Sequence, residues 1–263
     1  MWILLFGCCV VVAAIILLII FCRSSEGFES DSVWVINLTR RPDRWKLASQ
    51  RLQNAGLTPK RWNAVDARDI EAPNNKLTVT QYACYLSHLT LWKHIYNSGV
   101  PYALIFEDDL KFAPGITRKD LEKELQIAKG FDMLFFGHCG AKQFSSPVVL
   151  PGYAACGHAY AISRKGIEKI LNSPGHLSLP VDMIGYNMCK KVGNCYISHN
   201  VPITNQPKPS TPVYGIVHQD TTLGSDINWY IGNFWMGIKW IIGYVIYATK
   251  MCEKLIGLMG SDV

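Results

Sequence analysis

Short apolar runs alternate along this chain with longer segments of helical periodicity, and this alternation constrains the fold more than any other feature. Six runs are too short for helices and are typical of strands: residues 33–38, 61–66, 102–106, 131–137, 157–163 and 194–198. The segments between them carry helix signals, such as Pro42 at a first turn, Gly56 and Gly99 at ends, and Ser163 as a cap. They are residues 42–56, 80–99, 118–129, 163–173 and 181–191. Strands alternating with helices predict an α/β sandwich with a largely parallel sheet.

The N-terminal run from Trp2 to Cys22 contains no charged side chain. About 20 such residues span a bilayer as a helix. A cleaved signal peptide is the alternative, but its apolar core is usually shorter, with basic residues before it and small residues at the cleavage site. Here nothing basic precedes the run, and Phe21-Cys22-Arg23 is a poor cleavage site. We therefore expect a single-pass transmembrane signal-anchor over residues 1–23 and a linker over residues 24–32, with the side of the membrane left open.

A second aromatic-rich apolar stretch, Trp229–Tyr247, is interrupted by Lys239. It fits a second span, an interfacial helix or a buried terminal helix. We expect residues 229–263 to form an apolar C-terminal segment that contacts the membrane or packs against the domain.

The net charge of +6 comes from scattered basic residues, without a basic run or a basic stripe that includes aromatic residues. This pattern argues against nucleic-acid binding. None of the nine cysteines forms a CxxC pair, so the cysteine spacing does not predict a zinc site. Cys189 and Cys195 bracket a plausible turn. They would form a disulfide in an oxidising lumen and remain apolar thiols in the cytosol.

Three adjacent acids, Glu107, Asp108 and Asp109, follow the apolar run Tyr102–Phe106 directly. Ligands of open α/β sheets bind beyond the carboxyl ends of strands. Acids at such an end can hold a hard divalent cation, act as acid/base groups, or mark a solvated turn. A cation relieves the repulsion among three neighbouring carboxylates most directly, and the preceding strand fixes them on a rigid element.

Five motifs in order resemble glycosyltransferase family 25, which contains lipopolysaccharide and procollagen galactosyltransferases. They lie between about residues 33 and 227 and read "VWVINLTRRPDRW", "YACYLSHLTLWKHI", "YALIFEDDLKF", "GHAYAISRKGIEKIL" with "LPVDM", and "GSDI". The resemblance implies a GT-A-like (Rossmann-like) nucleotide-sugar-binding domain, which we place over residues 33–228. It also implies inverting transfer of a hexose, galactose or glucose, from a UDP-sugar to a glycan, glycolipid or glycoprotein hydroxyl.

In that family reading, Glu107-x-Asp109 takes the place of the fold's Asp-x-Asp element and holds Mn²⁺ or Mg²⁺. Asp109 is the expected direct ligand, whereas Asp108 and Glu107 ligate through water or hold the ribose. Such folds often recruit a downstream histidine as a further metal ligand, and His218 is the candidate; the alternative is a surface histidine.

Asp182 lies where such enzymes carry the base that takes the acceptor proton, although it could instead cap a helix. His158 is expected on the acceptor side, with a satisfied buried histidine as the alternative. His88 lies one helical turn after Cys84, a spacing that does not by itself make a metal site, and we expect His88 to pack behind the site. Four residues near early strand ends are expected to contact the nucleotide base and diphosphate, or else to solvate a helix start: Asn37, Arg41, Arg44 and Asp66.

Two other functions compete with an active, membrane-anchored, metal-dependent transferase. One is a catalytically inactive transferase-like domain that binds carbohydrate or serves a structural role in the membrane. The other is a metal-dependent phosphohydrolase or nucleotidyltransferase. The nucleotide product separates them, because transfer releases UDP whereas pyrophosphatase action releases UMP.

Overall fold

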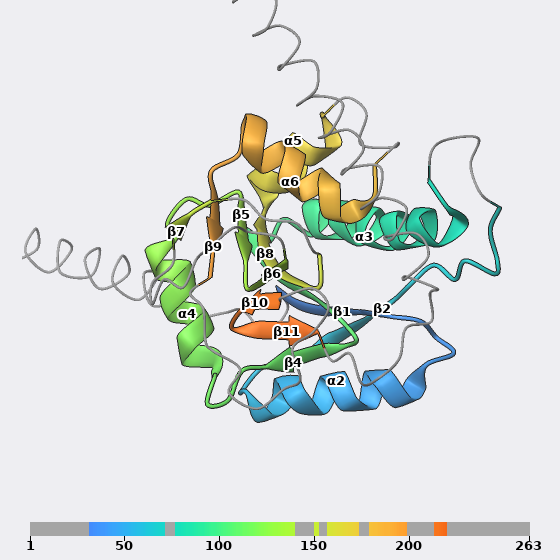
Figure 1. Ribbon diagram of the computed structural model, residues 1–263, viewed down its shortest axis with the longest axis horizontal. Coiled ribbons are helices and arrows are strands. Elements are labelled where there is room, and N and C mark those ends of the chain that lie inside the picture. The colour runs from blue at the N-terminus through green and yellow to red at the C-terminus, as the bar shows by residue number, and fades with distance from the viewer. Residues whose placement is uncertain are drawn as a thin grey trace, which may run out of the picture. The chain divides into compact units, whose positions relative to one another are not determined.

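A seven-stranded sheet lies at the centre of the computed structural model (Figure 1). The structure describes residues 32–71, 77–139, 150–152, 157–173, 179–198 and 213–219. Its elements, in chain order, are β1 (Val33–Asn37), α2 (Pro42–Asn54), β2 (Lys60–Asn63), α3 (Val79–Ser98), β3 (Tyr102–Glu107), β4 (Leu110–Phe112), α4 (Arg118–Ile127), β5 (Met133–Phe135), β6 (Gly137–Cys139), β7 (Leu150–Pro151), β8 (Ala159–Ser163), α5 (Arg164–Leu171), α6 (Val181–Lys191), β9 (Cys195–Ile197), β10 (Val213–Gly215) and β11 (Val217–Gln219).

The strands of the central sheet follow the order β2-β1-β3-β8-β5-β9-β7. Strands β2, β1, β3, β5 and β9 run in one direction, while β8 and β7 run in the other. The predicted α/β sandwich is therefore confirmed. The sheet is mixed rather than largely parallel, because β8 is inserted antiparallel between β3 and β5.

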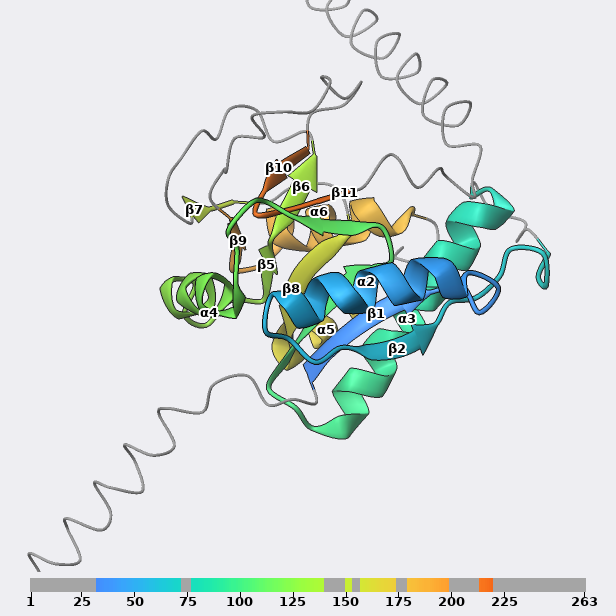
Figure 2. The same cartoon turned by 90° about the horizontal axis from the view of Figure 1, so that it is seen from below.

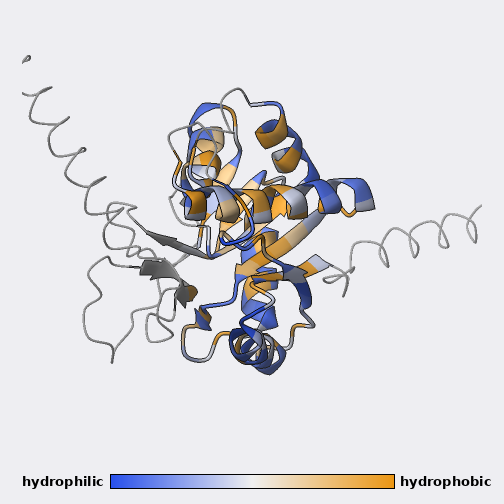
Figure 3. Cartoon of the chain, turned by 90° about the vertical axis from the view of Figure 1, so that its right-hand side faces the viewer, coloured by the Kyte–Doolittle hydropathy of each residue, from blue (hydrophilic) through white to orange (hydrophobic). Residues whose placement is uncertain are grey.

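Helices cover both faces of this sheet, as Figures 1 and 2 show, with α3, α5 and α6 on one face and α2 and α4 on the other. Strand β3 illustrates how the sequence produces the two layers. Ala103 and Ile105 pack with α3, α5 and α6, whereas Leu104 and Phe106 join the core of the opposite face. Successive strand side chains point to opposite faces, so a strand covered on both sides is apolar throughout. The apolar colouring of the central strands in Figure 3 reflects this double burial.

Helix α3 begins just before the predicted Thr80, because Thr78 and Gln81 form a reciprocal capping box that was not predicted. Gly99 ends this helix as predicted, with a φ of 81°. The Ser163 side chain accepts a hydrogen bond from the Gly166 amide at the start of α5. Pro42 opens α2 as predicted.

The stretch 213–219 returns to the region of the three acids through two small antiparallel sheets. Strand β10 pairs with β6, and β11 pairs with β4, which begins directly after Asp109. The Ile216 amide also donates to the Phe136 carbonyl oxygen at 2.9 Å. This late segment of the chain thus lies beside the carboxyl end of β3.

Among the helices that the structure describes, none combines the length and the apolar character needed to cross a bilayer. The expected signal-anchor over residues 1–23 and the apolar segment over residues 229–263 lie outside the described residues. Both stay predictions.

A disulfide joins Cys189, near the end of α6, to Cys195 in β9, with 5.6 Å between the two Cα atoms. The intervening turn passes so close that a Cβ at Gly193 would lie 2.9 Å from the Cys195 sulfur. The sequence left open whether Cys189 and Cys195 form a disulfide or remain thiols, and the structure contains the disulfide.

Replacing Cys189 or Cys195 with serine is expected to lower the free energy of unfolding by about 2 kcal/mol, because the unfolded chain regains the entropy of an open loop. Thermal unfolding with and without reductant checks this. The wild type should fall to the stability of the serine variants when reduced. A wild type insensitive to reductant would contradict the expectation.

Candidate active site

The three acids lie at the carboxyl end of the central strand β3. Glu107 is its last residue, and Asp108 and Asp109 form the turn into β4. Strand β1 runs parallel beside β3, with Ile36 opposite Glu107. Asn37, the last residue of β1, therefore ends at the same edge of the sheet.

Asp108 is held by two side chains from the first part of the chain. Arg44 Nη1, on α2, donates to Asp108 Oδ1 at 2.8 Å, and Asn37 Nδ2 donates to Asp108 Oδ2 at 2.5 Å. Arg61 Nε in turn donates to Asn37 Oδ1 at 2.9 Å. All of Asn37, Arg44 and Asp108 are buried. The arrangement gives Asp108 a charge partner and fixes the turn that carries Asp109.

Glu107 and Asp109 are not compensated in this way. Burial, and then the charge of Asp108, raises the pKa of Glu107 to about 7, with Arg44 acting in the opposite direction. Burial, followed by the charges of Glu107 and Asp108, raises the pKa of Asp109 to about 8. Asp109 Oδ1 is buried and finds no hydrogen-bond partner among the described residues. A cation would supply the missing positive charge and a partner for that oxygen.

Asp182 reaches the same place from the first turn of α6. The cap position of this helix is occupied by Pro180, and no side-chain capping bond forms, so the alternative of Asp182 as a cap does not hold. Asp182 instead accepts a hydrogen bond from the Gly157 amide. Burial and the charge of Glu107 raise the pKa of Asp182 to about 6, against the effects of His88 and of that amide.

Gly157 lies next to Asp182, His88 and Glu107. A Cβ built there would be 3.5 Å from Asp182 Oδ1, 3.7 Å from His88 Cε1 and 3.8 Å from Glu107 Oε1. These are ordinary contact distances, so alanine fits, whereas a larger side chain would fill the space among the three. The glycine therefore keeps the region between the carboxylates open.

His88 lies beside Glu107 and Asp182, next to the same space at Gly157. Its Nε2 is 3.4 Å from Glu107 Oε1, and its Nδ1 is 2.8 Å from the Tyr160 hydroxyl. That hydroxyl also accepts a hydrogen bond from Trp92 Nε1 at 2.8 Å. Burial lowers the pKa of His88 to about 4, although Asp182 acts against it, so the imidazole is neutral at physiological pH. The contacts of Tyr160 and Trp92 with His88 were not predicted from the sequence.

His158 is completely buried, and its Nε2 lies 3.2 Å from the Val217 carbonyl oxygen. Its own carbonyl oxygen accepts a hydrogen bond from the Glu107 amide at 2.8 Å. The structure thus shows His158 linking β3 to the late segment 213–219. Its expected place on the acceptor side stays a prediction.

Gly137→Ala is expected to lower the free energy of unfolding by about 3 kcal/mol, the upper range for overpacking. A Cβ at position 137 would lie 2.1 Å from both His158 Nε2 and the Val217 carbonyl oxygen. Gly157→Ala is the matched control, because its nearest contact would be 3.5 Å. Denaturant unfolding of the two variants measures the difference, and equal stabilities would contradict it.

Two of the residues expected to bind the donor form surface ion pairs. Asp66 accepts from Arg40 Nε and Arg68 Nη2, each at 2.7 Å. Arg68, with Arg40, holds the pKa of the Asp66 carboxyl well below its usual range, against partial burial. Arg41 pairs with Asp43 at 2.7 Å. The roles of Arg41 and Asp66 toward a donor, like those of Asn37 and Arg44, stay predictions.

His218 enters the site region through its backbone. In the β4–β11 ladder it lies opposite Lys111, two residues after Asp109. The structure therefore brings the backbone at position 218 close to the three acids, although the two are far apart in the sequence. Its role as a ligand stays a prediction.

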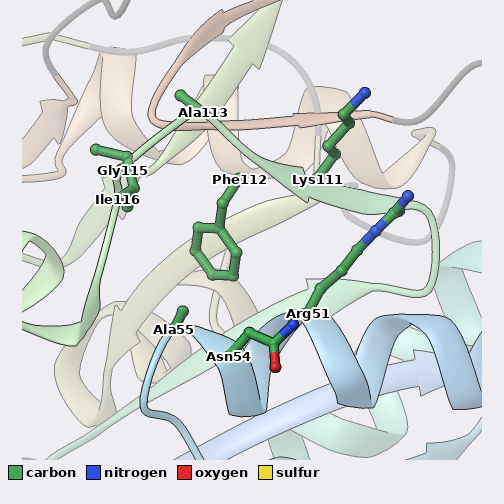
Figure 4. Close-up of a pocket in the computed structure, with 8 residues that line it drawn as sticks. All are labelled: Arg51, Asn54, Ala55, Lys111, Phe112, Ala113, Gly115 and Ile116. Carbon is green, nitrogen blue, oxygen red and sulfur yellow. The ribbon is translucent and has the colours of Figure 1, made fainter.

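A shallow depression of about 240 Å³ lies elsewhere, between α2 and the turn that follows β4 (Figure 4). Its lining residues are Arg51, Asn54, Ala55, Lys111, Phe112, Ala113, Gly115 and Ile116. None of Glu107, Asp109 and Asp182 lines this depression, so it is not part of the candidate active site.

Comparison with known proteins agrees with the family resemblance. A family model described as glycosyltransferase family 25 (LPS biosynthesis protein) matches residues 30–185. The chain is 29% identical over 188 residues to inactive glycosyltransferase 25 family member 3 of Mus musculus, covering 60% of this chain and 31% of the relative. It is 28% identical over 183 residues to procollagen galactosyltransferase 1 of Danio rerio, covering 58% and 30%. The matches thus span about a third of the length of these relatives.

Among solved structures, the chain overlaps with a glycosyltransferase involved in the glycosylation of the major capsid of PBCV-1. The TM-score is 0.40 at 8% sequence identity, covering 64% of this chain and 80% of that chain. The fold assignment rests on the sheet topology above and not on this overlap.

Proposed function

The chain belongs to glycosyltransferase family 25, and from this premise we propose that its domain transfers a hexose from a UDP-sugar to a glycan, glycolipid or glycoprotein hydroxyl, with inversion. One observation carries the proposal. Glu107, at the end of β3, and Asp182, at the start of α6, converge around Gly157. Asp109, two residues after Glu107 and acted on by its charge, adds an unpartnered buried oxygen. A GT-A-like donor site at this sheet edge fits that arrangement.

The cation proposed for this site is Mn²⁺ or Mg²⁺. Asp109 would hold it, because its Oδ1 has no hydrogen bond among the described residues and hard cations prefer carboxylate oxygens. Glu107 lies beside it for a water-mediated contact, and His218 is the candidate for a further ligand. We give Asp108 a positioning role, since both of its oxygens are engaged by Arg44 and Asn37. When bound, such a cation neutralises charge on the departing diphosphate.

Asp182 is the proposed general base. Its carboxylate takes the proton of the acceptor hydroxyl while that oxygen forms a bond to the anomeric carbon. The bond from the anomeric carbon to the diphosphate oxygen breaks on the opposite side, and the bonding electrons leave with UDP. A pKa of about 6 keeps Asp182 mostly ionised at pH 7 yet more basic than an ordinary aspartate. Asp182 then releases the proton to solvent.

We further propose that the enzyme is membrane-tethered and that its domain faces an oxidising compartment. The charge-free run from Trp2 to Cys22 supports the tether. The Cys189–Cys195 disulfide supports the compartment, because such bridges persist outside the reducing cytosol. A membrane-bound enzyme of this kind would meet lipid-linked glycans or glycoproteins as acceptors.

The test is release of UDP by the purified protein from a panel of UDP-sugars with Mn²⁺, with EDTA as control. Slow transfer to water needs no knowledge of the acceptor. We expect release from one sugar, abolished by EDTA, which would also identify the donor. Formation of UMP would instead indicate a pyrophosphatase.

The competing proposal is a catalytically inactive domain, and one relative from Mus musculus is named as an inactive family member. It would release no UDP from any sugar. The three site carboxylates argue for activity, since desolvation raises the pKa of Glu107, Asp109 and Asp182, a cost that a purely structural domain has no reason to maintain.

A further inference from the structure

A second group of metal-binding side chains adjoins the proposed donor site. Cys84 and His88 lie four residues apart on α3 and so share one face of that helix. Glu107 faces them from the end of β3. Cys84 Sγ, a ring nitrogen of His88 and a carboxylate oxygen of Glu107 all lie within 4.8 Å of one another, and Cys84 is a free thiol. We propose that these three side chains bind a transition-metal ion of the Zn²⁺ type, at a position separate from the cation proposed for Asp109.

A buried ring nitrogen of His88 without a hydrogen bond supports the same assignment. Nε2 is buried and forms no hydrogen bond among the described residues, although Glu107 Oε1 lies 3.4 Å away. The other ring nitrogen is fixed, because Nδ1 can donate to the Tyr160 oxygen, which also accepts from Trp92. Histidine ligands of metals usually donate their second N–H in this way. In the tautomer with the proton on Nδ1, which metal binding requires, Nε2 offers its lone pair to the cluster.

The donor set selects the kind of metal. One thiolate, one imidazole and one carboxylate suit Zn²⁺, whereas Mn²⁺ and Mg²⁺ favour oxygen ligands. Zinc bond lengths of 2.0–2.3 Å at tetrahedral angles place neighbouring ligand atoms about 3.3–3.7 Å apart. The His88–Glu107 separation of 3.4 Å already matches, and the thiol needs to approach by at most about 1 Å. As the metal–sulfur bond forms, the Cys84 thiol releases its proton to solvent without a change of oxidation state.

The fourth metal position would face the space left open by Gly157. A Cβ there would lie 3.7 Å from His88 Cε1 and 3.8 Å from Glu107 Oε1, so the glycine leaves room for water or for Asp182 as the fourth ligand. Three protein ligands and an open position are typical of a reactive or regulatory zinc site rather than a closed structural one.

Occupation of this site has a consequence that rests on the proposed function. Glu107 cannot serve both the zinc ion and the donor site, so zinc would inhibit sugar transfer. The inhibition requires Cys84, which the transfer reaction itself does not use.

Absorption spectroscopy of the full chain with Co²⁺, a spectroscopic substitute for Zn²⁺, tests the proposal. We expect a near-ultraviolet thiolate-to-cobalt band that saturates at one Co²⁺ per chain and disappears when Zn²⁺ is added. Cys84→Ser should lose the band, and His88→Asn should bind Co²⁺ at least about 10-fold more weakly. Asp109→Asn and the matched cysteine variant Cys252→Ser should retain it.

Absence of the band in the wild type, or its persistence in Cys84→Ser, would overturn the proposal. Thermal unfolding in metal-free buffer establishes that the variants fold, and added Zn²⁺ should raise the Tm of the wild type but not of Cys84→Ser. In the UDP-release assay, Zn²⁺ should inhibit the wild type and spare Cys84→Ser. If no sugar yields UDP, the proposed function fails, while the cobalt spectra still decide whether this site exists.

Discussion

Asp182→Asn is expected to lower kcat for sugar transfer by about 10²–10⁴-fold, the usual contribution of a general base. Asparagine keeps the size of the side chain but cannot take the acceptor proton. Donor binding should change little, because the proposed cation ligand is Asp109. Initial rates at saturating acceptor, with donor KM measured in parallel, check this. Glu168→Gln, which alters an exposed carboxylate on α5, is the matched control and should leave the rate unchanged.

The pH dependence of the transfer rate tests the role of Asp182 as general base in a second way. Burial and Glu107 raise the pKa of Asp182 to about 6. Because the base must be ionised, the rate of the wild type should rise with pH through about 6 and then level off. The residual rate of Asp182→Asn should not show this rise with pH. A variant with the kcat of the wild type, or with the same rise of the rate through about pH 6, would contradict the role of Asp182.

Asp109→Asn is expected to change activity and stability in opposite directions. Cation stabilisation of the departing diphosphate is worth several kcal/mol, so its loss should slow metal-dependent UDP release by at least about 100-fold. Without metal, however, the variant should be more stable than the wild type at pH 8. The variant no longer buries a carboxylate whose Oδ1 has no hydrogen-bond donor among the described residues.

The sign of the pH effect follows from the raised pKa. The Asp109 pKa rises from 3.8 in the unfolded chain to about 8 in the fold, so the folded state holds the extra proton between these values. Stability of the metal-free wild type should therefore fall as pH rises through this window. We expect the variant to melt at least about 3 °C higher at pH 8, with the difference shrinking toward pH 4. Added Mn²⁺ should raise the Tm of the wild type alone, and a variant less stable than metal-free wild type at pH 8 would contradict this reading.

Much of the fold could be predicted because its signals are local. The apolar runs that became β1, β3, β5 and β8 are buried on both faces, and caps such as Ser163 and Gly99 work through their immediate neighbours. The direction of β8 could not be predicted in this way. It depends on the path of the chain between β5 and β8, which strand periodicity does not encode.

In the candidate site, too, the features with local sequence signals could be predicted, and those that depend on the tertiary fold could not. The three acids were identifiable because they end a buried strand, and Asp182 through its family motif. The locking of Asp108 by Asn37 and Arg44 was not foreseen, since it depends on the parallel pairing of β1 with β3. Nor was the approach of Cys84 and His88 to Glu107, although their four-residue spacing is visible in the sequence. Spacing along a helix places two ligands on one face, and only the tertiary fold supplies the third.

Calorimetric titration of UDP into the wild type and Asp109→Asn, with Mn²⁺ or with EDTA, tests the central claim most directly. It measures the cation–diphosphate site itself and does not require turnover. We expect UDP to bind the wild type only with Mn²⁺ and to bind Asp109→Asn at least 10-fold more weakly, about 1.4 kcal/mol in binding free energy. Equal affinity in EDTA, or equal affinity of the two proteins, would show that the acids at the end of β3 do not hold a metal-bound nucleotide.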